Sequence, residues 1–178
     1  MLTLTVPAST LYKSSSHEFI NLKETTIQLE HSLVSISKWE SKFCTPFIGR
    51  QLTLPEFREY VKCMTMTQNV NPLLYHSLTK ENAIDIKEYM DRPMTASTFH
   101  GRPRNTSGEF VTSETLYCLM FNLNIPKECE KWHLNRLIAL IRYCQAKAAP
   151  PEKMSKAETE AYYAKLNEER RKMWGTKG

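Results

Sequence analysis

Glycine is scarce in this chain, and the motifs that usually accompany enzymatic chemistry are missing. The 178 residues include five glycines, of which Gly175 and Gly178 lie at the C-terminal end. A glycine-rich loop that wraps a phosphate is therefore not expected, and there is neither a G-x-S-x-G elbow nor an H-E-x-x-H zinc motif. We accordingly expect no catalytic residues and no cofactor.

Closely spaced cysteines and long apolar runs are also missing. The five cysteines are odd in number and widely spaced, without a C-x-x-C pair, which predicts reduced thiols rather than a disulfide framework. No apolar run approaches the ~18 residues of a membrane span. The stretch from 2 to 11 is interrupted by polar residues and Pro7, so that a signal peptide is not predicted either. The sequence is typical of an intracellular protein without a membrane anchor.

Two groups of residues resemble chemical sites only loosely. Cys129 and His133 are four residues apart and would face the same way on a helix, but a zinc site needs about four ligands and no second pair has suitable spacing, so we expect no metal site. The run Glu30-His31-Ser32 contains hydrolase-like residue types, but neighbours in sequence need not meet in space. A cap at a strand-to-helix junction is the favoured interpretation.

Positive charge is present without being concentrated. The formal net charge is +5, and Arg92, Arg102 and Arg104 lie in one stretch. Phosphates of a nucleic acid are one ligand for such arginines, but aromatic side chains do not interleave with them as stacking platforms would. A solvated loop or an acidic protein partner is therefore favoured over nucleic acid.

The sequence does contain clear periodicity. Residues 1–30 alternate between apolar residues and threonines at Leu2, Leu4 and Val6 and again over 26–29, which predicts a small β hairpin or meander. Helical periodicity follows over 31–147, apart from a stretch at 91–112 that is rich in proline, glycine and arginine and predicts an exposed loop or hairpin. The predicted fold is α+β and predominantly α-helical, with a compact helical bundle.

Individual helices have recognisable beginnings. N-caps are predicted at Ser32, Thr53, Asn71 and Thr79. A helix from Pro126 to about Ala146 is apolar on more than one side, and we expect it to be the central core helix.

The C-terminal part, 148–178, is predicted to be a linker followed by an amphipathic helix. A Pro-Pro pair at 150–151 precedes a capping box that begins at Ser155. An apolar stripe that finds no place in its own core usually docks on another protein. The residues predicted to bind a partner on this helix are Tyr162, Tyr163, Leu166, Met173 and Trp174, with the three loop arginines as further candidates.

Several phrases of the sequence resemble a known family. They are, in collinear order, residues 29–43 (LEHSLVSISKWESKF), 60–65 (YVKCMT), 92–97 (RPMTAS), 125–129 (IPKEC), 131–137 (KWHLNRL) and 150–155 (PPEKMS). Together they span most of the chain, and they are similar to phrases in the tail assembly chaperones of long-tailed (siphovirus-type) bacteriophages.

The resemblance implies a non-enzymatic role in tail morphogenesis in the host cytoplasm. Such chaperones bind the tape measure protein and keep its long helix soluble, so that the expected partners are the tape measure protein, the tail tube protein and, left open, further copies of this chain. No residue of the matching phrases carries a role that can be transferred. The alternative is a structural virion protein of the tail or of the head–tail connector (neck) region.

Overall fold

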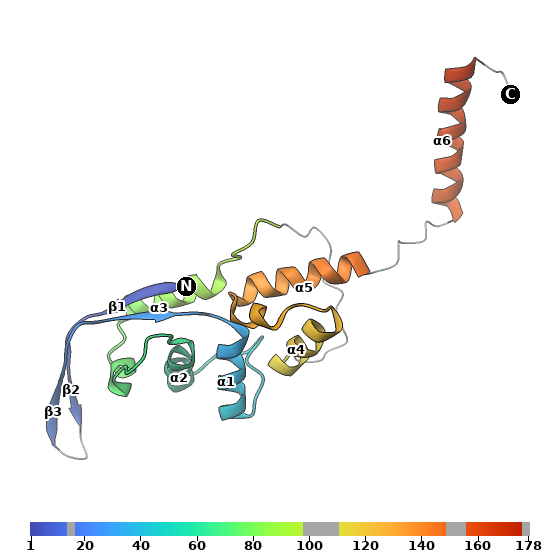
Figure 1. The fold of residues 1–178 in the computed structure, drawn as a ribbon. Coiled ribbons are helices and arrows are strands. Elements are labelled where there is room, and N and C mark those ends of the chain that lie inside the picture. Colours follow the sequence, from blue (N-terminus) through green and yellow to red (C-terminus); the bar gives the residue numbers. More distant parts are fainter. Residues whose placement is uncertain (14–16, 98–110, 149–155, 176–178) are drawn as a thin grey trace. The chain divides into compact units, whose positions relative to one another are not determined.

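Strands come first in the chain and helices follow (Figure 1). The computed structural model describes residues 1–13, 17–97, 111–148 and 156–175, which contain four short strands and six α-helices. The predicted α+β class, predominantly helical with an N-terminal β element, is confirmed. The chain divides into a first unit, Met1–Gln145, and a second unit, Ala146–Gly178, and each is described by itself.

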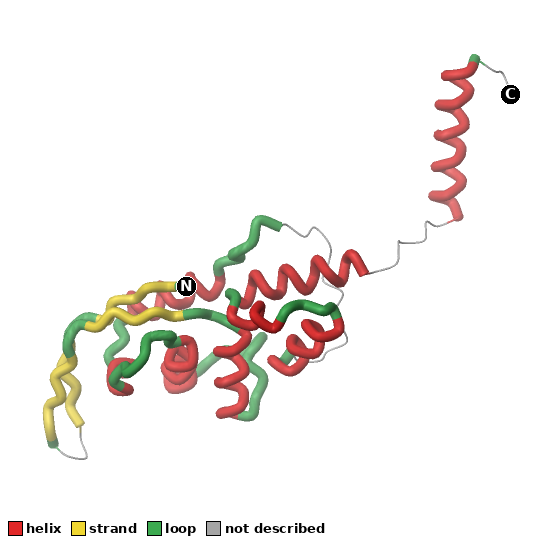
Figure 2. Tube along the Cα trace, viewed as in Figure 1, coloured by secondary structure: helices red, strands yellow, loops and turns green. Residues whose placement is uncertain are grey.

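The strands form one long antiparallel ribbon. Strand β1 (Leu2–Val6) pairs with β4 (Thr25–Leu29), and β2 (Ser9–Lys13) pairs with β3 (Glu18–Leu22). Both ladders share one register, with Val6 opposite Thr25 and Ser9 opposite Leu22. The ribbon bends between the two ladders, next to Pro7, because proline has no N–H to continue the pairing (Figure 2). The predicted hairpin is confirmed. It contains two pairs of strands, whereas the alternation at 2–6 and 26–29 indicates only one pair.

Four helical segments of the first unit begin where the sequence places their caps. The side chains of Ser32, Asn71 and Thr79 accept hydrogen bonds from backbone N–H groups in the first turns that follow them, and Thr53 N–H donates to Glu56 Oε2 at 2.8 Å. The bounds are α1 Leu33–Phe43, α2 Leu54–Met64, the 3₁₀ turn η1 Pro72–His76, α3 Lys80–Asp91, α4 Ser113–Asn122, the 3₁₀ turn η2 Lys127–Lys131 and α5 Leu134–Ala148.

The predicted helix from Pro126 to Ala146 is wrong in its first third. After η2 the backbone extends through Trp132 and His133, and α5 begins only at Leu134. His133 forms an isolated antiparallel bridge with Ser32, and Leu134 N–H donates to the His31 carbonyl at 2.8 Å. This long-range pairing takes the backbone groups that a continuous helix would use, so tertiary structure overrides local propensity.

The core lies between the β1–β4 half of the ribbon, which we call the inner half, and the helices. Trp39 of α1 and Tyr60 of α2 are completely buried, and the ring centroid of Phe47 lies 4.1 Å from that of Tyr60. Helix α5 buries Leu134, Leu137 and Ile141, whereas its Tyr143 is 47% exposed. Helix α5 therefore contributes one buried face to the core. The sequence predicts a central core helix that is apolar on more than one side, and this differs from the structure.

In the described residues, the second unit contains the last residues of α5 and helix α6, Lys156–Trp174. The predicted C-terminal helix is confirmed, while the linker and Ser155 lie outside the described residues. The same holds for 98–110, the greater part of the predicted exposed loop. Within the described ranges, no helix combines the length and the apolar character needed to cross a membrane.

Candidate functional site

Helix α6 exposes most of the side chains that the sequence predicts to bind a partner. The exposed fractions are 54% for Tyr162, 55% for Tyr163, 76% for Met173 and 75% for Trp174, and Leu166 is partly exposed. The rings of Tyr162 and Tyr163 meet edge to face with centroids 5.8 Å apart. Large apolar side chains left this open in a helix are typical of a surface that another molecule covers.

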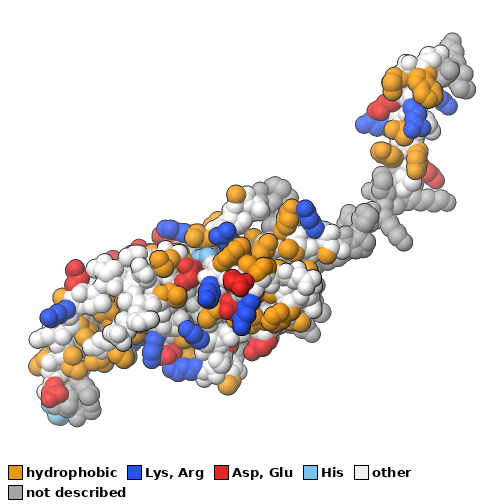
Figure 3. Space-filling model, in the orientation of Figure 1, with side chains coloured by type: hydrophobic (Ala, Val, Ile, Leu, Met, Phe, Trp, Pro, Cys, Tyr) orange, Lys and Arg blue, Asp and Glu red, His pale blue; other side chains and the backbone are white. Residues whose placement is uncertain are grey.

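These side chains occupy one sector of the helix. At about 100° per residue, Tyr162, Leu166 and Met173 fall within about 40° of one another, and Tyr163 and Trp174 lie together about 100° further round. Arg170 also falls in this sector. The ion pair of Lys172 with Glu168, at 2.8 Å, lies on the opposite side, where Lys172 lowers the pKa of the Glu168 carboxyl. Figure 3 shows hydrophobic side chains gathered along α6 beside charged ones. We call the five predicted residues the α6 apolar sector.

The three arginines predicted as partner contacts are only partly described. Arg92 is exposed at the C-terminal end of α3, and its carbonyl accepts a hydrogen bond from Asn135 Nδ2 at 2.8 Å, so α5 fixes the backbone where the predicted loop begins. Arg102 and Arg104 lie outside the described residues. The predicted site residues thus fall into two units, with Arg92 in the first and the α6 apolar sector in the second.

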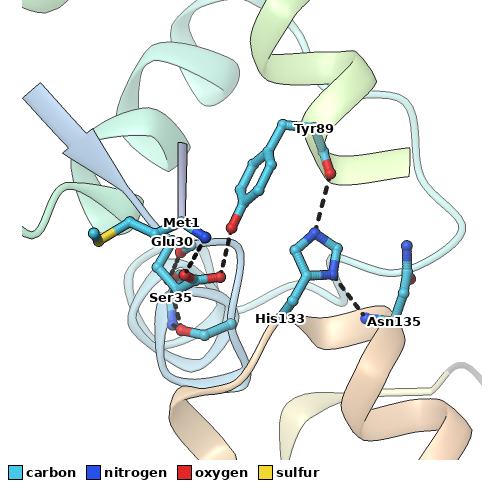
Figure 4. Close-up of polar contacts among 7 residues, drawn as sticks. Met1, Glu30, Ser35, Tyr89, His133 and Asn135 are labelled. Atoms are coloured by element: carbon cyan, nitrogen blue, oxygen red, sulfur yellow. Dashed lines mark hydrogen bonds and ion pairs between the residues drawn. The ribbon is translucent and has the colours of Figure 1, made fainter. Parts of the chain in front are cut away.

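A buried polar cluster, which sequence reasoning did not identify, joins four elements of the first unit. Tyr89 O–H donates to Glu30 Oε1 at 2.6 Å, and the other carboxylate oxygen of Glu30 lies 3.0 Å from the amino group of Met1 (Figure 4). Burial, followed by the hydrogen bond to Glu30, raises the pKa of the Tyr89 hydroxyl. The phenol therefore stays protonated as a donor.

His133 is held in one tautomer within this cluster. Its Nε2 lies 3.0 Å from the Tyr89 carbonyl, which can only accept, and Asn135 N–H donates to Nδ1 at 3.3 Å (Figure 4). The ring is therefore neutral with its hydrogen on Nε2. Burial is the largest cause of the lowered pKa of His133, while the hydrogen bond to the Tyr89 carbonyl and the charge of Glu30 act in the opposite direction.

His31 lies beside His133 and is the more perturbed of the two. The ring centroids are 5.2 Å apart, and His31 Nδ1 is 2.5 Å from the Tyr60 hydroxyl. Burial, with a smaller contribution from the neighbouring His133, lowers the pKa of His31 to about 3. Both histidine rings are 4% exposed, and the hydrogen bonds of the cluster join the segment after β4 to α2, α3 and the beginning of α5.

Glu40 is a second buried residue with a role that the sequence does not signal. This carboxylate of α1 is 6% exposed and accepts hydrogen bonds from the backbone N–H groups of Phe47, at 2.8 Å, and Ser113, at 2.7 Å. Ser113 is the first residue of α4, where the helix dipole favours a negative charge. Glu40 therefore fixes the beginning of α4 against the end of α1.

Cys129 and His133 do not share a helix face, contrary to the sequence expectation. Cys129 belongs to η2, whereas His133 lies in the extended segment before α5. Both ring nitrogens of His133 form hydrogen bonds with protein groups. In the part of the chain that the structure describes, no group of three or more histidine, cysteine or acidic residues is arranged to hold a metal ion.

Two shallow hollows lie on the surface of the first unit. In one, the Arg136 guanidinium stacks over the Trp132 ring, 4.1 Å from its centroid. The other lies between α2 and η1 and mixes acidic, basic and aromatic side chains. The lining residues of the first are Thr95, Ser97, Trp132, Arg136, Ala139, Leu140 and Tyr143, and those of the second are Pro55, Arg58, Glu59, Lys62, Pro72, Tyr75 and His76.

Comparison with known proteins gives no further guide to the site, because no protein-family model, no curated protein and no solved structure matches this chain.

Proposed function

We propose that this chain is a non-enzymatic assembly chaperone of phage tails, which binds the tape measure protein, tail tube components or both in the host cytoplasm. The observation that carries the proposal is the α6 apolar sector, with Met173 and Trp174 about three-quarters exposed. A tape measure protein is a long helical client with apolar surface, and an amphipathic helix covers such a surface through side chains at this spacing. The collinear phrases that resemble those of tail assembly chaperones favour the same function.

The energetic scale is sufficient for reversible capture. Covering the exposed part of Trp174 alone would contribute on the order of 3 kcal/mol from the area removed from water. A few such aromatic anchors usually dominate a protein interface. A chaperone must also release its client, and an interface limited to one helix sector suits that requirement.

The proposal is tested by co-expressing the full chain with the tape measure protein and measuring how much client stays soluble and is captured. The double substitution Tyr163→Ser, Trp174→Ser should abolish capture of the tape measure protein. The matched control, Glu168→Ser with Lys172→Ser, changes the opposite side of the same helix and should capture as well as the original chain. Equal capture by both variants, with helix content unchanged by circular dichroism, would reject the role of the α6 apolar sector.

The second candidate, a structural virion protein of the tail or neck, is favoured by the open hairpin β2–β3, because strand addition is a common way to join subunits permanently. Mass spectrometry of purified particles separates the two functions. Stoichiometric presence of the chain in particles supports the structural role, whereas its absence from particles and abundance in the infected lysate supports the chaperone.

A further inference from the structure

The first of the two surface hollows lies along one side of helix α5. Arg136, Ala139, Leu140 and Tyr143 line it at the spacing i, i+3, i+4 and i+7, which places them on a single side of the helix. Trp132, just before the helix, also lines the hollow. This side is separate from the face that α5 buries in the core.

The other wall of the hollow is the segment that follows α3, at Thr95 and Ser97. Helix α5 holds the beginning of this segment in place, because Asn135 Nδ2 donates to the carbonyls of Met90, at 3.0 Å, and Arg92, at 2.8 Å. Thr95 Oγ1 accepts from Ser97 N–H at 3.1 Å, which forms a local turn and leaves the Thr95 hydroxyl hydrogen as a donor. Both walls therefore belong to the folded first unit.

The charge that lines the hollow is positive. Among the described residues of the lining, Arg136 alone is charged. Helix α5 contains basic residues and no acidic one, and the segment 92–97 contains Arg92 and no acidic residue either. Within the described ranges, Arg136 belongs to no ion pair. A negatively charged partner would complement this surface.

Arg136 is held in place by Trp132. Its guanidinium carbon lies 4.1 Å from the centroid of the Trp132 ring, so the aromatic side chain covers one face of the cation. A stacked guanidinium still presents N–H groups along its edge, and these match the two oxygens of a carboxylate. Because the stack already orders this long side chain, less conformational entropy is lost when a carboxylate binds.

The size and the lining of the hollow indicate what fills it. Its volume of about 230 Å³ is smaller than the ~300–1,000 Å³ of pockets that enclose a small ligand, but it has room for a side chain of a polypeptide lying across it. Ala139 and Leu140 supply aliphatic surface beside Arg136. A nucleic acid is less well suited, because Arg136 already covers a face of the Trp132 ring on which a base would stack.

We propose that this hollow is a docking site for an acidic segment of another protein, in which a glutamate or aspartate binds the edge of Arg136 and a neighbouring apolar side chain packs on Ala139 and Leu140. Thr95, on the other wall, supplies a further hydrogen-bond donor. The lining residues all belong to the first unit, whereas the α6 apolar sector belongs to the second. This inference does not rest on the tail-assembly function.

Nuclear magnetic resonance of the full chain tests the site, with the Trp132 indole N–H as the reporter. The probes are short blocked peptides, each with a glutamate beside one leucine, phenylalanine or tryptophan, and each has a counterpart with glutamine in place of the glutamate. At least one glutamate peptide should shift the Trp132 signal with a Kd of about 1 mM or lower. Its glutamine counterpart should bind at least about tenfold more weakly, because it lacks the charge that Arg136 recognises.

Two arginine variants separate the site from general attraction between charges. Arg136→Gln should weaken binding of the glutamate peptide at least about tenfold. Arg142→Gln is the matched control, because it makes the same substitution at an exposed arginine of the same helix that does not line the hollow, and it should bind like the original chain. The spectra of both variants report directly whether they are folded. The Tyr163→Ser, Trp174→Ser variant should also bind the peptide normally, which keeps this test independent of the proposed function.

Four results would overturn the proposal. The first is the absence of a Trp132 shift with every glutamate peptide, and the second is equal binding of the glutamate and glutamine peptides. The third is an equal loss of binding in the two arginine variants, which would show attraction to the overall positive charge. The fourth is a shift of Trp132 by single-stranded oligothymidylate at lower concentration than by any peptide, which would assign the hollow to nucleic acid.

Discussion

Replacement of His31 by asparagine should remove a large part of the acid sensitivity of the fold. His31 is 4% exposed, and burial lowers its pKa to about 3, against 6.5 for an unperturbed histidine. In the folded protein the ring is therefore neutral, whereas in the unfolded chain it binds a proton as the pH falls below 6.5. Stability from the neutral ring is complete above that pH and is lost as the pH falls toward 3.

The size of this loss follows from the two pKa values. Each pH unit between them costs up to about 1.4 kcal/mol, which gives a loss of about 2 kcal/mol at pH 5 and of about 4–5 kcal/mol by pH 3. These losses are large against a total stability of roughly 5–15 kcal/mol for a domain of ordinary size. His133, whose pKa burial also lowers, adds to the acid sensitivity in the same direction.

The assay is urea unfolding followed by tryptophan fluorescence between about pH 7.5 and about pH 5, a window that covers the first ~2 kcal/mol of the predicted loss. His31→Asn retains a polar atom near the Tyr60 hydroxyl but no longer titrates. The variant should be less stable at neutral pH, and its free energy of unfolding should fall about 2 kcal/mol less than that of the original chain across this window. Parallel pH profiles for the two proteins would refute the argument that burial keeps His31 neutral.

Three further predictions follow from buried or exposed side chains. Glu40→Gln should lower the free energy of unfolding by about 2–4 kcal/mol in the same assay, because the amide NH₂ would face a backbone donor such as Ser113 N–H; Glu160→Gln, on α6, should have little effect. Asn82→Ala should cost about 1–2 kcal/mol, since the Asn82 side chain accepts from Thr79 N–H at the α3 cap and donates to the Thr5 carbonyl. Trp174, 75% exposed, should be quenched by acrylamide in the free chain and protected when a client binds, and unchanged quenching on binding would contradict its role.

The local elements are largely predictable because their signals lie within a few residues. A cap such as Ser32 or Thr79 satisfies N–H groups two or three positions away, so the beginning of the helix is visible in the sequence. The same is true of the α6 apolar sector, whose residues are all neighbours on one helix. The predicted helix start at Pro126 was wrong because the segment around His133 pairs instead with the segment around Ser32, about a hundred residues earlier in the chain.

The buried polar groups could not be found in this way. From the sequence alone, Glu40 would be expected to be a solvent-exposed residue of an amphipathic helix. The two N–H groups that donate to it belong to Phe47, in a loop, and to Ser113, in a helix far along the chain. His31 and His133 are separated by about a hundred positions, and only the fold brings their rings to 5.2 Å. Strands β2 and β3 lie within the β element predicted for 1–30, but no alternation marks them individually, since apolar residues occur on both of their faces.

The sequence by itself determined the fold class, the positions of most helices and the apolar sector of α6, because periodicity and capping depend on residues close together in the chain. Tertiary structure alone decided where the helix before Leu134 breaks, which histidines stay neutral, which carboxylate joins α1 to α4, and which half of the ribbon keeps open edges. Each of these depends on a hydrogen-bond partner or a loss of solvent supplied by distant residues, and neither is encoded in any short stretch of sequence.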